Sequence, residues 1–285
     1  MKILVIGDFH GGFPTKLKNK LKKKHFDLVV GLGDYFPFGT RKLFFKYCYG
    51  TDLEVWDVIG KKKYKEIELK DRKQGLKLLE FLDRNYANII SITGNIDRTK
   101  WKEAHRQYDK PLGKKWAWIE KEFFSKASKN LKNMKFFDWS FTKFKDYIFI
   151  GYPESNFPGH IQSKEYKKQR KKLEALFNRF KKENEKGKVI LVSHNVPYKT
   201  KLDAIKPKIK YKVIKREHYG SKLAKRIIEK YKPKLTLCGH MHENYGTDKI
   251  GKSLIVNPGA AQDGRAAIID LPEKKKDKIK IKFIK

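Results

Sequence analysis

The sequence begins with KILVIGDFH at residues 2–10, where an apolar run over 3–6 is followed at once by Asp8 and His10. Short runs rich in Ile, Val and Leu, bounded by Gly and polar residues, are typical of buried strands. Four further runs are built in the same way, and each leads into residues that can bind a metal ion. They are 28–32 before Gly33-Asp34, 89–93 before Gly94-Asn95-Ile96-Asp97, 189–192 before Ser193-His194, and 235–238 before Gly239-His240-Met241-His242.

The metal-binding side chains of these five clusters are expected to meet in space. Ligands of open α/β sheets bind where strands emerge into loops, and every cluster lies at such a position. Together they offer three carboxylates, an amide and four imidazoles, from Asp8, Asp34, Asp97, Asn95, His10, His194, His240 and His242. This set is large enough for two divalent metal ions. Asp34 is the predicted bridging ligand, because it stands alone after its strand and a carboxylate can bridge two metals about 3.5–4 Å apart.

The types of ligand restrict the metals that would bind. Imidazole suits Zn, Fe, Mn, Co and Ni, while carboxylate and amide oxygens favour Mn or Fe. The two cysteines, Cys48 and Cys238, form no CxxC pair. A thiolate-based zinc site and a disulfide framework are therefore not expected. We expect two divalent ions from the group Mn, Fe, Zn, Ni and Co as cofactors, with Mn supporting activity.

In order and spacing, the clusters resemble the motifs of the calcineurin-like metallophosphoesterase family. That family's pattern runs D-x-H, G-D, G-N-H-[D/E], a single His and then G-H-x-H. Here the elements span residues 8–242, and Asn257-Pro258-Gly259 is similar to the turn that often follows the last of them. The resemblance implies an α/β fold, a four-layer αββα sandwich of two mixed sheets flanked by helices.

The resemblance also implies a division of the ligands and a reaction. One metal would be held by Asp8, His10, Asp34 and His242, and the second by Asp34, Asn95, His194 and His240. The implied activity is metal-dependent hydrolysis of a phosphate mono- or diester, in which a metal-bound hydroxide attacks phosphorus.

The third motif departs from the family pattern. Where the family carries a His after Asn, this chain has Ile96, which cannot donate a proton. General acid help is typically worth ~10²–10⁴-fold, so another donor is needed for poor leaving groups. His218 is the first candidate and His160 the second, although a solvated loop histidine is the more ordinary interpretation of each. Asp97 either serves the site or pairs locally with Arg98. The predicted catalytic residues are Asn95, Asp97, His194 and His218, of which Asn95, His194 and His218 would also contact the substrate.

The remaining pattern alternates strands with helices. Helical periodicity predicts helices over 69–84, 163–184 and 221–231, and apolar runs predict strands over 253–256, 265–271 and 278–284, the last two as a hairpin. Such alternation followed by a strand-rich tail favours two stacked sheets with helices outside. Because the motifs run from residue 8 to 242, no division of the chain leaves a complete site. We therefore expect one domain over 1–285, with insertions at 35–68 and 98–124.

No targeting signal is recognisable in the sequence. The apolar stretch after Met1 ends at Gly7, which is too short for a signal peptide, and no run approaches the length of a membrane span. A cytoplasmic location without a membrane partner is expected. No feature of the sequence specifies an oligomeric state.

The chain is strongly basic, with 68 Lys and Arg residues against 32 acids and a net charge of +36. Such a field concentrates polyanions and speeds their capture, so we expect a phosphorylated anionic substrate. A thermophilic habitat or a Lys-biased genome would also raise the Lys content.

Both expected insertions mix aromatic with basic residues, for example Tyr49 and Trp56 in the first and Trp101, Trp116 and Trp118 in the second. Rings that stack on bases and cations that contact phosphates hold single-stranded nucleic acid, although the same rings could form the packed underside of a lid. Nucleic acid is thus a candidate partner. The competing function is a non-catalytic or weakly catalytic nucleic-acid-binding protein that retains the fold.

Overall fold

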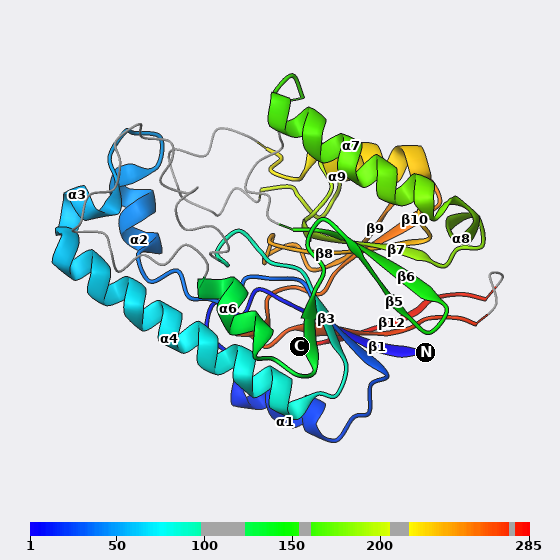
Figure 1. Ribbon diagram of the computed structural model, residues 1–285, viewed down its shortest axis with the longest axis horizontal. Coiled ribbons are helices and arrows are strands. Elements are labelled where there is room, and N and C mark those ends of the chain that lie inside the picture. Colours follow the sequence, from blue (N-terminus) through cyan, green and yellow to red (C-terminus); the bar gives the residue numbers. More distant parts are fainter. Residues whose placement is uncertain (98–122, 154–160, 206–216, 274–276) are drawn as a thin grey trace.

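Two mixed sheets of six strands face each other in the computed structural model, which describes residues 1–97, 123–153, 161–205, 217–273 and 277–285 (Figure 1). In spatial order, the first sheet contains β12 (Lys280–Ile284), β11 (Ala266–Asp270), β1 (Lys2–Ile6), β2 (Leu28–Gly31), β3 (Ile89–Ser91) and β4 (Met134–Phe136). The second contains β5 (Phe141–Phe144), β6 (Tyr147–Tyr152), β7 (Val189–Asn195), β8 (Leu235–Gly239), β10 (Ser253–Asn257) and β9 (Gly246–Ile250). The predicted fold class is confirmed.

The central strands of each sheet run parallel. Antiparallel strands lie at both edges of the second sheet and at the β12 edge of the first. β1, β2, β3 and β4 are parallel neighbours, as are β6, β7, β8 and β10. The strands that precede the metal-ligand clusters are all among these parallel strands. Each sheet therefore presents its cluster-bearing loops at the carboxyl ends of its strands, where ligands bind in such sheets.

Alternation along each strand divides the apolar residues between two faces. In β1, Ile3 and Val5 point into the core between the sheets, and Leu4 and Ile6 point to the opposite face. Both faces are buried, which is why these strands appear in the sequence as continuous apolar runs and not as alternating ones.

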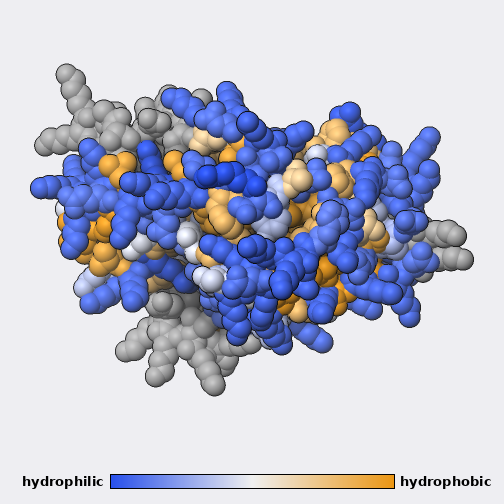
Figure 2. Space-filling view, turned by 90° about the horizontal axis from the view of Figure 1, so that it is seen from below, coloured by the Kyte–Doolittle hydropathy of each residue, from blue (hydrophilic) through white to orange (hydrophobic). Residues whose placement is uncertain are grey.

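Helices cover the outer face of each sheet, giving the four layers seen in Figure 1. α1 (Thr15–Lys22), α4 (Lys61–Asn85) and α6 (Phe123–Lys129) lie on the side of the first sheet, and α7 (Lys164–Arg179), α8 (Lys181–Glu185) and α9 (Lys222–Tyr231) on the side of the second. The Ser221 side chain caps α9 by accepting a hydrogen bond from the Ala224 N–H. Figure 2, which views the molecule from the side of α1 and α4, shows a surface that is mostly hydrophilic.

Several short elements lie between the main ones. They are α2 (Arg41–Leu43), the π-helical turn η1 (Phe44–Cys48), α3 (Val55–Ile59) and the 3₁₀ turn η3 (Ala261–Asp263). The first three, together with the start of α4, occupy the segment that the sequence predicted to be an insertion at 35–68. The expected second insertion at 98–124 lies almost wholly outside the described residues.

Some element boundaries differ from those predicted. α4 begins at Lys61 and not at residue 69. The prediction missed its first turns because they are rich in charged residues and carry little apolar periodicity. The predicted helix over 163–184 is interrupted at Phe180, whose buried ring packs on Phe141 with the centroids 4.6 Å apart. The strands β4, β5 and β9 were not predicted, since they are short and contain Lys. The strand β6 was also missed, although it is an apolar run of six buried residues.

Among the described helices, none combines the length and the apolar character needed to cross a membrane.

Candidate metal centre

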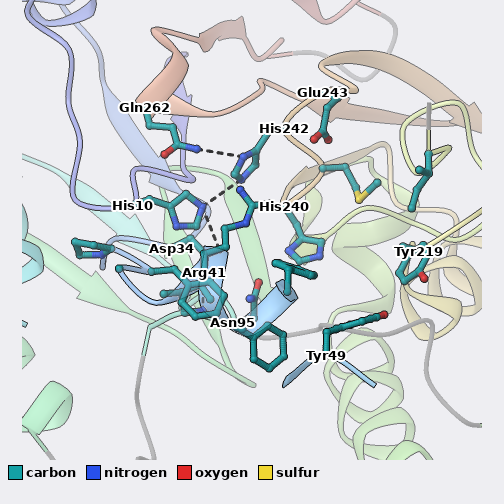
Figure 3. Close-up of a pocket in the computed structure, with 18 residues that line it drawn as sticks. His10, Asp34, Arg41, Tyr49, Asn95, Tyr219, His240, His242, Glu243 and Gln262 are labelled. Carbon is teal, nitrogen blue, oxygen red and sulfur yellow. Dashed lines mark hydrogen bonds and ion pairs between the residues drawn. The ribbon is translucent and has the colours of Figure 1, made fainter. Parts of the chain in front are cut away.

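Six of the predicted ligands form two groups at the carboxyl ends of the strands. Asp8, His10 and His242 make the first group, and Asp34, His194 and His240 make the second. Within each group the ligand atoms lie within 4.8 Å of one another. The close-up in Figure 3 shows His10, Asp34, His240 and His242 turned toward a common centre.

The first group joins the loop after β1 to the loop after β8. His10 Nε2 lies 3.2 Å from His242 Nε2, and His242 Nε2 lies 3.4 Å from Asp8 Oδ1. The Asp8 carboxylate also accepts the backbone N–H of His240 at 3.0 Å, which links the two loops directly. Two imidazole nitrogens that face each other beside a carboxylate leave a place for a shared cation.

The second group lies around Asp34, and it includes Asn95. His194 Nε2 is 3.5 Å from Asp34 Oδ2 and 2.8 Å from Asn95 Oδ1. Asp34 Oδ2 is also 3.7 Å from His10 Nε2, so one carboxylate oxygen lies near a ligand of each group. The sequence placed His194 just after a strand, whereas the structure keeps it within β7.

Backbone conformation at the site is unusual. Four of the eight non-glycine residues with positive φ in the described part of the chain are candidate ligands: Asp8, His10, Asp34 and His240. The left-handed region is strained for such residues and persists where the surroundings enforce it, commonly at functional sites. Here it turns consecutive side chains toward one centre.

Two glycines allow the carboxylates to approach the neighbouring loops. A Cβ atom on Gly94 would lie 2.2 Å from Asp34 Oδ1, and one on Gly239 would lie 2.5 Å from Asp8 Oδ2. Any larger residue at these positions would displace a candidate ligand.

Asp97 connects the backbone of the two loops that carry Asp34 and Asn95. Its Oδ2 accepts the backbone N–H groups of Asp34 (2.7 Å) and Gly94 (2.8 Å), and its Oδ1 accepts those of Tyr35 (2.7 Å) and Phe36 (3.3 Å). Burial and the nearby Asp34 carboxylate raise the pKa of Asp97 to about 8, and the backbone N–H groups oppose this shift. Asp97 is 2% exposed and is not among the residues that line the cavity described below. In this structure Asp97 therefore holds the Asp34 and Asn95 loops together.

The carboxylates of the two groups are held ionised. Burial acts to raise the pKa of both Asp8 and Asp34, but their histidine neighbours outweigh it. His242 lowers the pKa of Asp8, and His194 and His10 hold that of Asp34 well below its usual range.

The histidines differ in their affinity for protons. Burial acts to lower the pKa of His194, but attraction to Asp34 raises it to about 10. Burial and the nearby His194 lower the pKa of His240 to about 3, and burial lowers that of His10. For His242 the hydrogen bond and charge of Asp8 overcome burial and raise the pKa. His10 and His240 thus present neutral imidazoles, the form that binds metals.

The residues present fit a pair of divalent ions. Asp8 and Asp34 are 1% and 2% exposed, and histidines are their only ion-pair partners in the described part of the chain. Two buried carboxylates among four imidazoles match the mixed oxygen and nitrogen donors that transition metals prefer.

Two groups that orient the ligands could not be recognised in the sequence. The Leu32 carbonyl accepts a hydrogen bond from His194 Nδ1 at 2.7 Å, which turns Nε2 toward Asp34 and Asn95. Gln262 Nε2 lies 3.3 Å from His242 Nδ1 on the far side of that ring (Figure 3). Such contacts fix the ring orientation of metal-binding histidines. The carbonyl has no side-chain signal, and a single Gln has no motif.

The turn at Asn257 has a related role. Its side-chain amide donates to the carbonyls of Met241 and Asn244 at 2.9 and 3.1 Å, and its Oδ1 accepts the Gly259 N–H. The Asn257 side chain thereby fixes the loop that carries His240 and His242.

The other predicted catalytic residue, His218, belongs to neither ligand group. His218 Nδ1 is 2.8 Å from the buried Asp203, and His218 does not line the cavity beside the two groups. Ile96 does line that cavity, and its backbone N–H donates to Asp34 Oδ1 at 2.8 Å. His160, Arg98, Trp101, Trp116 and Trp118 lie outside the described residues.

A cavity of about 630 Å³ opens beside the ligand groups. His10, Asp34, Asn95, His240 and His242 line one part of it. Its other walls come from the segment after Asp34 and from residues near Tyr219 and Met241. A substrate larger than a phosphate group can therefore reach the ligands.

Comparisons with known proteins agree with this geometry. The family model of the calcineurin-like phosphoesterases matches residues 1–244. An uncharacterized protein of Methanocaldococcus jannaschii is 39% identical over 72 residues, which are 25% of this chain and 30% of that protein. The match thus spans less than a third of the relative's length.

Solved structures share the fold at low sequence identity. A Thermus thermophilus protein superposes with a TM-score of 0.54 at 15% identity, covering 99% of this chain and 97% of that one. A dimetal phosphatase from Danio rerio gives a TM-score of 0.55 at 9% identity, covering 100% of this chain and 96% of that one. At these identities the likeness concerns the fold alone.

Proposed function

Because this chain belongs to the calcineurin-like phosphoesterase family, we propose that it is a dinuclear metal-dependent phosphoesterase that hydrolyses phosphate mono- or diesters. The observation that carries the proposal is the position of Asp34. Its Oδ2 lies 3.7 Å from His10 in one ligand group and 3.5 Å from His194 in the other. That position suits a carboxylate shared by two metal ions.

The division of ligands follows from the two groups. Asp8, His10 and His242 would hold one ion and His194, His240 and Asn95 the other, with Asp34 shared between them. When bound, the ion pair supplies Lewis-acid activation of the phosphate and of a water molecule. Hydrolysis joins the water oxygen to phosphorus while the ester P–O bond breaks, and the leaving oxygen takes up a proton.

The chain's own residues would align the phosphate. Asn95 lines the cavity with its Oδ1 directed at His194, which leaves its amide NH₂ for a phosphate oxygen. Arg41 lines the same cavity and lies close enough to His10 for its charge to lower the pKa of that histidine. A guanidinium there would attract the phosphate dianion.

The first test is metal loading followed by an assay. We expect the purified chain to hold two metal ions by elemental analysis and to hydrolyse p-nitrophenyl phosphate with Mn²⁺. A chelator should abolish hydrolysis, and added Mn²⁺ should restore it. An enzyme preparation with full metal content and no hydrolysis of any phosphate mono- or diester would contradict the proposal.

A second candidate function is favoured by the net charge of +36. A non-catalytic nucleic-acid-binding protein would bind single strands with an affinity that falls steeply with salt, as phosphate neutralisation requires. Such binding, retained in chelator by a chain that hydrolyses no ester, would identify this alternative.

Ile96 gives a prediction about leaving groups. We expect hydrolysis to favour aryl esters over alkyl monoesters, because the Ile96 side chain offers no proton to the leaving oxygen. Ile96→His should raise kcat/KM for an alkyl phosphate by up to ~10²-fold and change that for an aryl phosphate much less. The measurement is kcat/KM over a series of esters that differ in leaving-group pKa.

Ile96→Gln is the matched control, because it is polar but cannot supply a proton near neutral pH. It should leave the dependence on leaving-group pKa as steep as in the unchanged chain. A similar gain from His and Gln would attribute the effect to polarity, and equal gains on alkyl and aryl esters would show that another group already protonates the leaving oxygen.

A further inference from the structure

The cavity beside the candidate metal centre has a wall of aromatic rings. Its members are Phe38, Phe44, Phe45 and Tyr49, which follow Asp34 in the sequence, and Tyr219 from another part of the chain. In Figure 3, Tyr49 and Tyr219 lie on the opposite side of the drawn residues from His10 and Gln262. We call these five residues the aromatic wall.

The four rings of the wall that follow Asp34 in the sequence hold one another in place. The centroids of Phe44 and Phe45 are 5.4 Å apart, those of Phe45 and Tyr49 5.4 Å, and those of Phe44 and Tyr49 6.0 Å. Phe38 lies 5.9 Å from Phe44. These are distances at which aromatic rings attract one another. The rings are therefore positioned before any ligand arrives, which reduces the entropy lost on binding.

The size and chemistry of the cavity exceed the needs of a bare phosphate. Its volume of about 630 Å³ lies within the range of roughly 300–1,000 Å³ that is common for small-molecule sites. Pro37, Ile96, Ile205 and Met241 add apolar surface next to the rings. Arg41 lines the cavity with its guanidinium 5.6 Å from the Phe45 ring centre, and its charge also acts on His10 of the first ligand group.

We propose that the aromatic wall binds a planar aromatic group of the substrate, so that this chain acts on phosphate esters that carry such a ring close to the phosphate. Nucleoside phosphates and simple aryl phosphates share this chemistry. The proposal rests on the proposed phosphoesterase function and names the class of ester that it acts on. Rings on the wall stack on the substrate ring, and Arg41 pairs with its anionic part.

Pairs of matched ligands distinguish the contribution of the aromatic ring to binding from that of the phosphate. Adenosine 5′-monophosphate and ribose 5-phosphate differ only in the base, and phenyl phosphate and cyclohexyl phosphate differ in having or lacking an aromatic ring of similar size. Binding to the metal-loaded chain is measured by calorimetry, and hydrolysis by release of inorganic phosphate. We expect each aromatic ester to bind about tenfold more tightly than its non-aromatic partner, because the stacking of one aromatic ring commonly contributes that much binding free energy.

Tyr49→Leu is the variant that tests the wall. Phe44 also packs into a small core with Cys48, Val55 and Tyr64, so its replacement could disturb the fold, whereas Tyr49 lies outside that core. We expect Tyr49→Leu to reduce the preference for adenosine 5′-monophosphate over ribose 5-phosphate about tenfold, chiefly through Kd and KM, and Tyr49→Phe to retain it. Tyr47→Leu is the control, because Tyr47 is 40% exposed and does not line the cavity.

The outcomes distinguish the two proposals. Equal affinity for the aromatic and the non-aromatic esters would overturn the aromatic subsite, even if every ester is hydrolysed. An equal effect of the Tyr47 and Tyr49 variants would overturn it as well. Selective binding of the ring-bearing esters without hydrolysis would support the subsite and contradict the proposed function. A preference for the nucleotide that phenyl phosphate does not share would identify the nucleoside as the source of the ring.

Discussion

Replacing Asp34 by Asn is expected to remove both metal ions and at least ~100-fold of the activity. Changes to groups that only orient metal ligands already cost about 10–100-fold, and Asp34 lies between both ligand groups. Its Oδ2 is 3.7 Å from His10 and 3.5 Å from His194. An amide keeps the shape of the side chain but loses the charge and one acceptor oxygen. The measurement is metal content per chain by elemental analysis together with kcat/KM for an aryl phosphate.

Two further variants are needed to interpret the result for Asp34→Asn. His10→Ala should reduce mainly one of the two metals, because His10 belongs to the first group only. Asp146→Asn is the matched control, since Asp146 has an 83% exposed side chain and exposed ion pairs contribute little stability. If Asp34→Asn still binds two metals, the assignment of Asp34 as a shared ligand is wrong.

Replacing Asp97 by Ala is expected to lower both the stability and the metal affinity of the protein. The carboxylate accepts backbone N–H groups from Asp34, Tyr35, Phe36 and Gly94 inside the protein. Each buried donor left without a partner costs about 1–3 kcal/mol, so with four such donors we expect the free energy of unfolding to fall by at least about 4 kcal/mol. Metal affinity should fall at least ~10-fold, because Asp34 loses its backbone anchor. Denaturant titration with a chelator present and calorimetric metal titration measure the two effects separately.

Asp83 provides a closely matched control. It is 8% exposed and accepts the backbone N–H groups of Lys132, Asn133 and Met134. Asp83→Ala should lower stability to a similar extent and leave the metal affinity of the folded protein unchanged. A catalytic role for Asp97 would give a different pattern, in which the Asp97→Ala protein that is saturated with metal still loses far more turnover than its metal content explains.

The candidate ligands could be predicted because their signals are local. A buried strand of an α/β sheet is a short apolar run, and Asp8, Asp34 and His240 each follow such a run within two residues. Ligand chemistry then limits which side chains can serve a metal. The layers of the fold could be predicted for the same reason, since apolar runs and helical periodicity depend on near neighbours in the chain.

Other parts of the fold had weak local signals. The first turns of α4 are dominated by charged residues, and only Tyr64 and Glu68 of those turns are buried. No Gly or Pro marks the end of α7 at Phe180, where the buried ring instead packs on Phe141 of β5. In both cases, tertiary packing decided what propensity left open.

The sequence by itself determined which side chains could bind metal and at which end of the strands they lie. Only the tertiary structure decided which loops meet there and what each polar group contacts. Asp97 accepts a hydrogen bond from the backbone of Asp34, 63 positions earlier in the chain, and Asp8 contacts His240 over 232 positions. Tyr219 lines the same cavity as the aromatic residues from Phe38 to Tyr49. Such contacts depend on how two sheets stack and on the rotation of each side chain. Neither the stacking of the sheets nor the side-chain rotation produces a periodic pattern in the sequence, because the contacting residues are determined by the packing of whole layers and not by neighbours in the chain.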